Sequence, residues 1–469
     1  MSASPKGAQR GAAERSARAL VGSLLAVLLA LACAALPAGA PGPRREAPPV
    51  ADGAGRPAHV VLISVAGLTP DRYLEGDAMP ALAALAREGV AVERVEPVAP
   101  AAVYPVHATL VTGVTPAEHG IVADQLIGER GVRATPPAHA TGLRAAALWQ
   151  RVAEAGGAVT ALDWPTTTGA EIASLLPDVA PLRAGERWET LAAGAATAWI
   201  AERLRAAPLA VAAPGPARDA LLVDLACAAF AQSPRLVLLR LRGAEAALLS
   251  AGPRSDAAAS AFAAVDGELE RLLRCASQAG VLPQAAFVVT GDRALESAHT
   301  AVRPNVWLRE AGWITPQGRW TALVRSNGSS AFVYANEART ALEVRKRLEA
   351  GARETGAFRV VSADEMIARG ADPDAWFGLQ AEPGFVFEND TAGATLAPAA
   401  ARGASGWLAR EGAPAVGLVA FGRGVRRGVV VPRMTQLDVA PTLAALLGVP
   451  LEAASGRSLV GLLRLAPGS

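Results

Sequence analysis

Lysine is almost absent from this sequence of 469 residues. It occurs only at Lys6 and Lys346, whereas arginine and alanine are abundant. A bias of this kind reflects genomic base composition, so we attach no functional meaning to it. The formal net charge of +2 gives no support to a nucleic-acid partner.

The features of a disordered chain are also missing. Charged residues make up only 19% of the sequence and hydrophobic residues 51%, which is enough to bury a sizeable core. We find no internal repeat. The length allows two or three average domains, or one large α/β domain that carries an insertion.

Cysteine is scarce, with only three residues in the chain. Cys227 and Cys275 both lie in apolar patterns of helical spacing. Export from the cytoplasm permits a disulfide between them. Two buried free thiols fit the same pattern at least as well, so the sequence leaves both alternatives open.

The N-terminus has the order of features found in a secretory signal peptide. A basic region precedes the apolar segment Ala19–Leu36, and the small residues Ala38-Gly39-Ala40 follow it. We therefore predict a signal peptide over residues 1–40, or an uncleaved membrane anchor, and a linker rich in Pro, Gly and Ala over residues 41–58. The protein is expected outside the cytoplasm, as a secreted, periplasmic or membrane-anchored chain.

Predicted strands and helices alternate along most of the chain. The predicted strands are His59–Ala66, Val90–Val98, Ala158–Asp163, Arg235–Leu241, Ala285–Thr290 and Ala415–Phe421. The predicted helices are Met79–Glu88, Leu143–Ala155, Trp188–Ala206, Ala217–Gln232 and a helix that Ser255 caps and Gly280 ends. This order predicts a parallel, doubly wound sheet with helices on both faces.

The pattern changes after Asp292. Short strands and turns surround one strong helix, Glu337–Glu349, which predicts an inserted α+β subdomain over about 302–400. The main α/β domain is then expected to span residues 59–464. It ends in a helix with Asp438 at the N-cap and Pro441 in the first turn.

The stretch Ala99–Asp124 has the frame of a catalytic loop that prolines stiffen. Its pattern resembles the nucleophile segment of type I phosphodiesterases and nucleotide pyrophosphatases of the alkaline phosphatase superfamily. The matching residues are Pro100, Pro105, His107, Thr112, Gly113, Pro116, His119, Gly120 and Ile121. Asp438, Pro441 and Thr442 match the start of the family's last helix.

The resemblance implies an alkaline-phosphatase-like three-layer α/β/α sandwich with an inserted cap. It also implies two zinc ions, about 4 Å apart, that clamp the attacking and leaving oxygens. The family's threonine nucleophile corresponds to Val103, which has no oxygen for attack on phosphorus. The asparagine that holds the phosphoryl oxygen corresponds to Asp124.

The family's metal ligands are mostly absent. Their positions correspond to Ala66, Glu245, Leu249, Asp292, Arg293 and Ser405. Only Asp292 and, on a loose alignment, Glu245 carry a side chain that can ligate, and a catalytic zinc needs about three protein ligands. Arg293 stays protonated and cannot bind zinc.

The remaining histidines offer little to rebuild such a site. His107 and His119 occupy positions where the family has histidines that are not ligands, and we expect them to form hydrogen bonds within the loop. His59 precedes the first strand and His139 lies in a proline-rich loop. His299 follows Asp292 closely in sequence and is the one histidine considered able to approach it, which would still make only two ligands. Tyr104, beside the missing nucleophile, is expected to pack against a substrate or in the core.

The sequence therefore predicts a catalytically inactive member of this family, with no cofactor and a binding or accessory role. Its partner is an unidentified small molecule or protein, and the membrane only if the N-terminal helix is retained. The alternative is an active hydrolase of phosphodiesters or related esters with altered metal ligation and two zinc ions.

Overall fold

The computed structural model describes residues 55–75, 78–179, 187–206, 214–408 and 412–464. The chain divides into two units, Met1–Glu46 and Ala47–Ser469, and the described residues all belong to the second. The predicted signal peptide or anchor, and most of the predicted linker, lie outside the described residues. Within the part that is described, no helix is long and apolar enough to cross a membrane.

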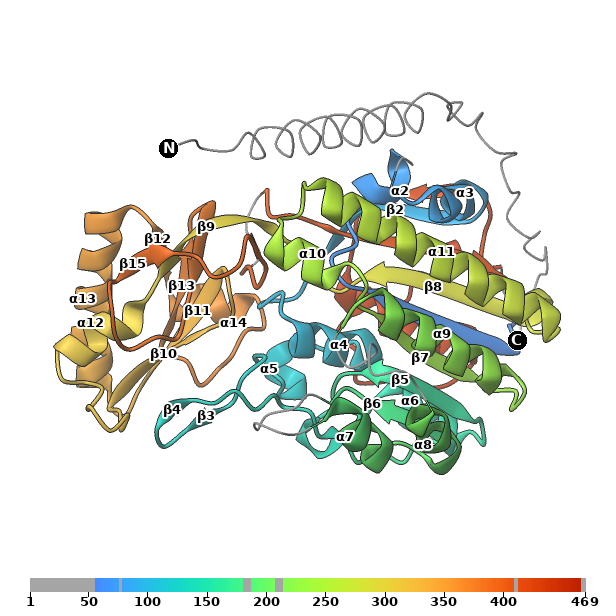
Figure 1. The fold of residues 1–469 in the computed structure, drawn as a ribbon, viewed down its shortest axis with the longest axis horizontal. Helices are drawn as coiled ribbons and strands as arrows, with labels where there is room; N and C mark the ends of the chain where they lie inside the picture. Colours follow the sequence, from blue (N-terminus) through green and yellow to red (C-terminus); the bar gives the residue numbers. More distant parts are fainter. Residues whose placement is uncertain (1–54, 76–77, 180–186, 207–213, 409–411, 465–469) are drawn as a thin grey trace, which may run out of the picture. The chain divides into compact units, whose positions relative to one another are not determined.

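A nine-stranded sheet lies at the centre of the fold (Figure 1). Its strands follow the order β18-β2-β17-β8-β1-β7-β5-β6, with β19 beside β2. Their bounds are β1 His59–Val65, β2 Val90–Glu96, β5 Val159–Trp164, β6 Ser174–Pro177, β7 Leu236–Leu241, β8 Ala285–Gly291, β17 Val416–Gly422, β18 Val429–Val431 and β19 Met434–Thr435. The predicted alternation of strands and helices is confirmed.

The prediction of a wholly parallel sheet is wrong for one strand. β1 runs parallel to both β7 and β8, but β17 runs antiparallel to both β8 and β2. The chain leaves the sheet at the carboxyl end of β8 and returns to it at the same edge. β17 must therefore run back along β8, with Leu418 opposite Thr290 and Gly422 opposite Ala286.

Both faces of the sheet are buried, which makes three layers. Val61, Ile63 and Val65 of β1 join one core, and Val60 and Leu62 join the other, as the two-residue period of a strand requires. Helices that contribute to the first core include α3 Pro80–Glu88, α7 Trp188–Ala195, α8 Ala198–Arg205, α9 Pro216–Phe230, α10 Glu245–Ser250 and α11 Asp256–Gln278. Those of the second include α4 Val103–Thr112, α6 Leu148–Glu154 and α15 Val439–Leu447.

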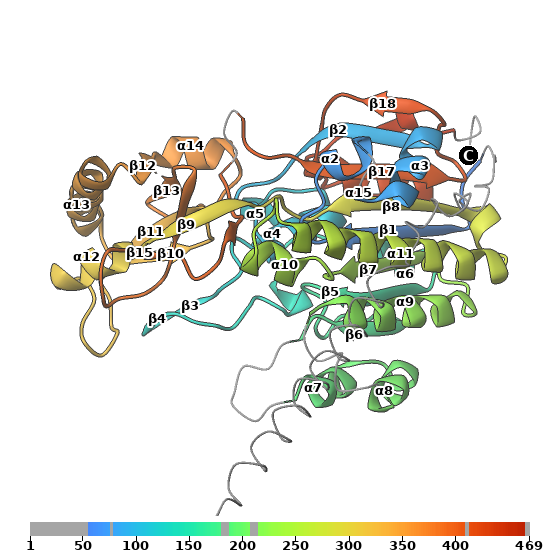
Figure 2. The same cartoon turned by 45° about the horizontal axis from the view of Figure 1, so that its top comes forward.

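A separate, third core lies in the region between β8 and β17 in sequence. Strands β10 Ala322–Ser326, β11 Ser330–Ala335, β12 Phe358–Val361 and β13 Phe377–Ala381 form a four-stranded sheet. Strands β9 Glu296–Val302, β14 Gly384–Phe387, β15 Leu396–Pro398 and β16 Gly403–Ala404 form another. The accompanying helices are α12 Pro304–Glu310, α13 Ala338–Thr355 and α14 Ala363–Ala368. We call this region the cap (Figure 2).

Two helix predictions need correction. The segment predicted as one helix, Trp188–Ala206, consists of α7 and α8, because extended backbone at Ala196 and Thr197 interrupts it. Asp438 stands before α15 but does not cap it. Its carboxylate accepts hydrogen bonds from the Thr435 and Arg457 N–H groups instead. By contrast, the predicted cap of α11 is confirmed, since Ser255 Oγ accepts from the Ala258 N–H.

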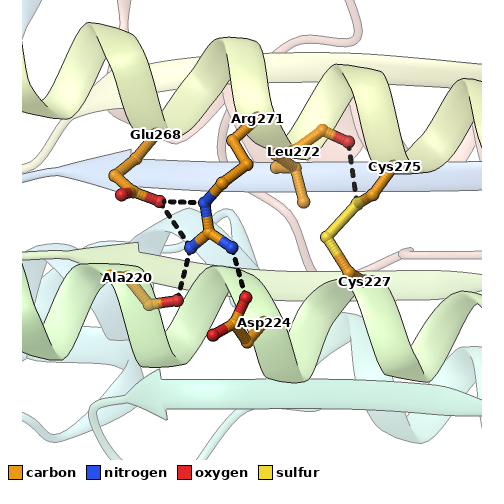
Figure 3. Close-up of a disulfide and its surroundings, with 7 residues drawn as sticks. All are labelled: Ala220, Asp224, Cys227, Glu268, Arg271, Leu272 and Cys275. Atoms are coloured by element: carbon orange, nitrogen blue, oxygen red, sulfur yellow. Dashed lines mark hydrogen bonds and ion pairs between the residues drawn. A yellow bond between two sulfur atoms is a disulfide. The ribbon is translucent and has the colours of Figure 1, made fainter.

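Cys227 of α9 and Cys275 of α11 form a disulfide, so the free-thiol alternative is wrong (Figure 3). The Cα atoms are 5.7 Å apart, which the geometry of a disulfide allows. Arg271 of α11 strengthens the same helix contact. It donates to the Ala220 carbonyl of α9 and forms ion pairs with Asp224 and Glu268.

We expect removal of this disulfide to lower the free energy of unfolding. The bridge closes a loop of 48 residues, and restriction of the unfolded chain by such a loop stabilises the fold by about 2–4 kcal/mol. Denaturant titration of the double variant Cys227→Ser/Cys275→Ser measures the loss. An unchanged unfolding free energy, with the disulfide verified in the parent protein, would contradict the expectation.

Candidate functional site: a buried guanidinium between two carboxylates

Two of the expected metal-ligand positions, Ala66 and Asp292, lie where β1 and β8 end. Val65 and Gly291 are register partners at the ends of these parallel strands. Ala66 and Asp292 therefore follow side by side at the same edge of the sheet. The Gly67 N–H donates to Asp292 Oδ1 over 3.0 Å. Gly67 also leaves no room for a side chain, because a Cβ would lie 2.3 Å from Leu248 Cδ1.

Arg293 places a positive charge at the centre of this site. Its Nη2 donates to Glu245 Oε1 over 2.6 Å, and its Nη1 pairs with Asp292 Oδ2. The other oxygen of Glu245 accepts from Arg242 Nε, also at 2.6 Å. The side chains of Asp292, Glu245 and Arg293 are at most 10% exposed. Each carboxylate therefore has a cationic partner within hydrogen-bond distance.

The charges of this group reinforce one another. Although burial opposes ionisation, Arg242 and Arg293 hold the pKa of the Glu245 carboxyl well below its usual range. Burial also acts to lower the pKa of Arg293, but Asp292 and Glu245 outweigh it and raise that pKa above its ordinary value. The Glu245 carboxylate and the Arg293 guanidinium are therefore both charged at neutral pH.

This donor set does not fit a zinc ion. Zinc requires ligands with a free lone pair, and a guanidinium has five N–H donors and no acceptor. Asp292 Oδ2 and Glu245 Oε1 already accept hydrogen bonds from the Arg293 guanidinium. In the part of the chain that the structure describes, no three His, Cys, Asp or Glu side chains are grouped as metal ligands would be.

The expected catalytic loop is largely helical, and this is a correction. Val103 is the first residue of α4, and α5 spans Pro116–His119. Pro105 is tolerated because it lies in the first turn, where the backbone N–H has no partner within the helix. The side chain of Val103 packs against the small cluster of Tyr104, Ala108 and Ile121.

Asp124 occupies the anion-binding end of α4. Its Oδ1 accepts from the Tyr104 N–H over 2.7 Å, and its Oδ2 accepts from the Val103 N–H over 3.2 Å. Free N–H groups at the start of a helix are a ready site for phosphate or another anion. Here the chain's own carboxylate uses two of them. Burial raises the pKa of Asp124, and these two donors oppose the increase.

The histidines of this segment have structural hydrogen bonds, as expected. His107 is fully buried, with Nδ1 2.7 Å from the Val103 carbonyl and Nε2 2.9 Å from Ser64 Oγ. Burial holds its pKa well below the usual value. His119 accepts from the Ile121 N–H at Nδ1 and lies 3.0 Å from Thr109 Oγ1 at Nε2. Burial lowers the pKa of His119 to about 3.

Other expected positions lie away from this group. Leu249 is 36% exposed on α10, whereas its neighbour Leu248 is buried. Ser405 joins the cap, where its carbonyl accepts from the Ser329 N–H. The expectation that His299 approaches Asp292 is not met. His299 is exposed, lies 2.8 Å from Thr300 Oγ1 and packs edge-on against Phe385.

The sequence analysis missed a second set of buried charges at the ends of β5, β6 and β7. Arg240 Nη1 donates to Asp178 Oδ2 over 3.1 Å, and Tyr104 Oη donates to the same oxygen over 3.0 Å. Arg242 lies 3.6 Å from Asp178 and so connects this set to Glu245. The feature of the sequence that could have revealed this set is Arg240, a charged residue inside the otherwise apolar run Leu236–Leu241.

Asp163 is the least satisfied member of this second set. Its side chain is fully buried, neither oxygen accepts a hydrogen bond from a described residue, and Arg242 is 4.0 Å away. Its backbone has φ 54°, a conformation that few residues other than glycine adopt. Burial, together with the charge of Asp178, raises the pKa of the Asp163 carboxyl to about 6.

Comparison with known proteins agrees with the architecture. The family described as type I phosphodiesterase / nucleotide pyrophosphatase matches residues 60–394. Murine ectonucleotide pyrophosphatase / phosphodiesterase 5, as an inactive variant in complex with AMP, matches with a TM-score of 0.62 and 19% identity over 86% of this chain and 99% of that chain. The human protein of that name matches with a TM-score of 0.61 and 17% identity over 86% of this chain and 99% of that chain. No curated protein matches the sequence.

Fold and site together define an α/β protein of the alkaline-phosphatase-like class, and the predicted fold class is thereby confirmed. The match to the family model covers more than half of the chain, and this extent is enough to assign the chain to the family. The chain belongs to the type I phosphodiesterase / nucleotide pyrophosphatase family. The low identity to the solved structures shows a common fold and carries no activity over to this chain.

We expect Arg293→Met to lower the free energy of unfolding by about 3–5 kcal/mol, because it leaves two buried carboxylates without their shared cation. The triple variant Asp292→Asn/Glu245→Gln/Arg293→Met removes the repulsion and should recover part of the loss. Denaturant titration provides the measurement.

The control is Arg339→Met, whose partner Glu343 is 49% exposed, with an expected change below about 0.5 kcal/mol. A loss below about 1 kcal/mol for Arg293→Met would contradict the electrostatic account.

The raised pKa of Asp163 predicts a pH dependence of stability. The folded protein holds a proton on Asp163 up to about pH 6, whereas the unfolded chain releases it near pH 4. Asp163 therefore contributes most to the free energy of unfolding at low pH, and this contribution is lost as the pH rises to about 6. The variant Asp163→Asn has no carboxyl to ionise, so it should not lose this stability, and asparagine tolerates the positive φ.

Unfolding titrations between pH 4 and 8 test this expectation. The Asp163→Asn variant should exceed the parent protein by about 2 kcal/mol at pH 8 and lose that advantage near pH 4. Glu343→Gln on the exposed face of α13 serves as the control and should leave the pH profile unchanged. A variant that is less stable than the parent at pH 8 would refute the assignment.

Proposed function

We propose that this chain is a catalytically inactive member of its family and acts outside the cytoplasm as a binding or accessory protein. The observation that carries the proposal is the ion-paired Arg293 between Asp292 and Glu245. A metal-dependent phosphodiesterase needs open ligand positions there. A fixed guanidinium instead neutralises both carboxylates.

The rest of the site supports the same conclusion. Val103 has no nucleophilic atom at the start of α4, and the carboxylate of Asp124 engages the two N–H groups at that helix end. Nucleophilic attack and metal clamping each lower the barrier of phosphoryl transfer by several kcal/mol. Loss of both leaves no evident route to catalysis.

The location outside the cytoplasm rests on two features. The Cys227–Cys275 disulfide is typical of oxidising compartments. The order of basic residues, apolar segment and Ala38-Gly39-Ala40 is typical of an exported chain. Both a cleaved signal peptide and a retained anchor agree with them.

An open cleft next to the degenerate site provides space for a small molecule. Its volume is about 590 Å³, and it lies between the turn after β1, α10 and β9. The lining includes Gly67, Thr69, Arg72, Leu248, Glu296 and His299. A small-molecule ligand here, or a protein that covers this opening, is the kind of partner we propose.

The experiment measures metal content and turnover on the same purified sample. We expect no stoichiometric zinc or manganese, and no hydrolysis of p-nitrophenyl phosphodiesters or nucleotides above background. Val103→Thr alone should remain inactive, because no metal lowers the pKa of the new hydroxyl. Two bound metal ions, with turnover that Asp292→Asn abolishes, would instead establish the alternative of an active hydrolase with altered ligation.

A further inference from the structure

The amino-terminal edge of the central sheet carries a cluster of arginines. We define the basic face as Arg56, Arg235, Arg423 and Arg426. They are distant in sequence but closely connected in space. Arg423 Nε donates to the Arg56 carbonyl, Arg235 Nη1 donates to the Pro57 carbonyl, and Arg426 Nε donates to the Leu463 carbonyl.

The basic face lacks acidic partners. None of its four arginines forms an ion pair with a carboxylate of the described residues. Burial and the nearby charge of Arg56 lower the pKa of Arg235, as expected where cations gather. Arg56 and Arg426 are exposed. A chain with a formal net charge of only +2 therefore gathers at one edge four arginines that pair with no carboxylate of the described residues.

Both ends of the described chain leave the fold at this edge. The Gly55 N–H donates to the Arg464 carbonyl over 2.9 Å, and the Arg464 N–H donates to the Gly424 carbonyl over 2.8 Å. The apolar segment Ala19–Leu36 precedes Gly55 by a stretch of 18 residues, 37–54. Even when fully extended, 18 residues span no more than roughly 60 Å, so a membrane that held the segment would lie within that distance of Gly55.

From this arrangement we propose that the basic face binds the anionic headgroups of a phospholipid bilayer. Arginine presents planar N–H donors that match phosphate oxygens, and each basic residue near an anionic surface strengthens binding roughly fivefold. The bound orientation points the carboxyl ends of the parallel strands, with the degenerate site, away from the lipid. The inference goes beyond the proposed function and does not depend on it.

The test uses the chain that begins at Pro41, which keeps every described element and both cores of the main domain. Flotation measures its binding to vesicles of 70% phosphatidylcholine and 30% phosphatidylglycerol, and to vesicles of phosphatidylcholine alone. We expect binding to the anionic vesicles only. Binding should disappear in 0.5 M NaCl, where screening shortens the range of surface charges to a few Å.

Two matched variants assign the binding to this face. Arg56→Gln/Arg423→Gln/Arg426→Gln should weaken binding at least tenfold. Arg130→Gln/Arg319→Gln/Arg353→Gln removes the same charge from exposed positions elsewhere and should change binding less than twofold. If the first variant fails to fold, Arg426→Glu replaces it, since that side chain makes only one bond, of 3.4 Å, to a carbonyl.

Three results with the chain that begins at Pro41 would overturn the proposal. They are absence of binding to anionic vesicles, equal binding to both kinds of vesicle, and an equal loss in the two triple variants. The last result would mean that net charge, not this face, decides the attraction. Binding restored only when residues 1–40 are present would assign the membrane contact to the N-terminal segment alone and would also contradict the proposal.

Discussion

The ion pairs of Arg293 with Asp292 and Glu245 are the constraint on which the rest of the site depends. Two carboxylates at the buried ends of parallel strands repel each other and lose hydration. Members of this family meet that cost with metal cations, and this chain meets it with a guanidinium. Since a guanidinium is part of the chain and always protonated, it can balance the charge of these carboxylates without a bound ion.

The presence of the Arg293 guanidinium also explains the apolar side chains at Ala66 and Val103. If the site binds no metal, as proposed above, a carboxylate at position 66 would have no cation, and a hydroxyl at position 103 would have nothing to activate it. Apolar side chains at these positions avoid the desolvation cost of unpaired polar groups. Asp124 keeps a carboxyl group in the site, and two N–H groups of α4 donate to it. The fold is retained, and on the function proposed above the features required for phosphoryl transfer are lost together.

Strand and helix patterns predicted most of the fold because hydrophobic periodicity reflects local burial. The direction of β17 escaped prediction, since it depends on where the chain re-enters the sheet after the cap. For the site, the order of the motifs predicted that Ala66, Val103 and Asp292 belong to one site. It did not show that Arg293 reaches Glu245, or that Asp124 caps α4, because such contacts depend on three-dimensional packing between distant segments.

Anomalous diffraction distinguishes a guanidinium from a metal ion between the two carboxylates. Crystals grown in the presence of zinc, measured on both sides of the zinc absorption edge, locate the metal without reference to any activity. We expect guanidinium density for Arg293 between Asp292 and Glu245, and no anomalous peak within coordination distance of either carboxylate. A zinc peak ligated by Asp292 or Glu245, with Arg293 displaced from both, would contradict this expectation.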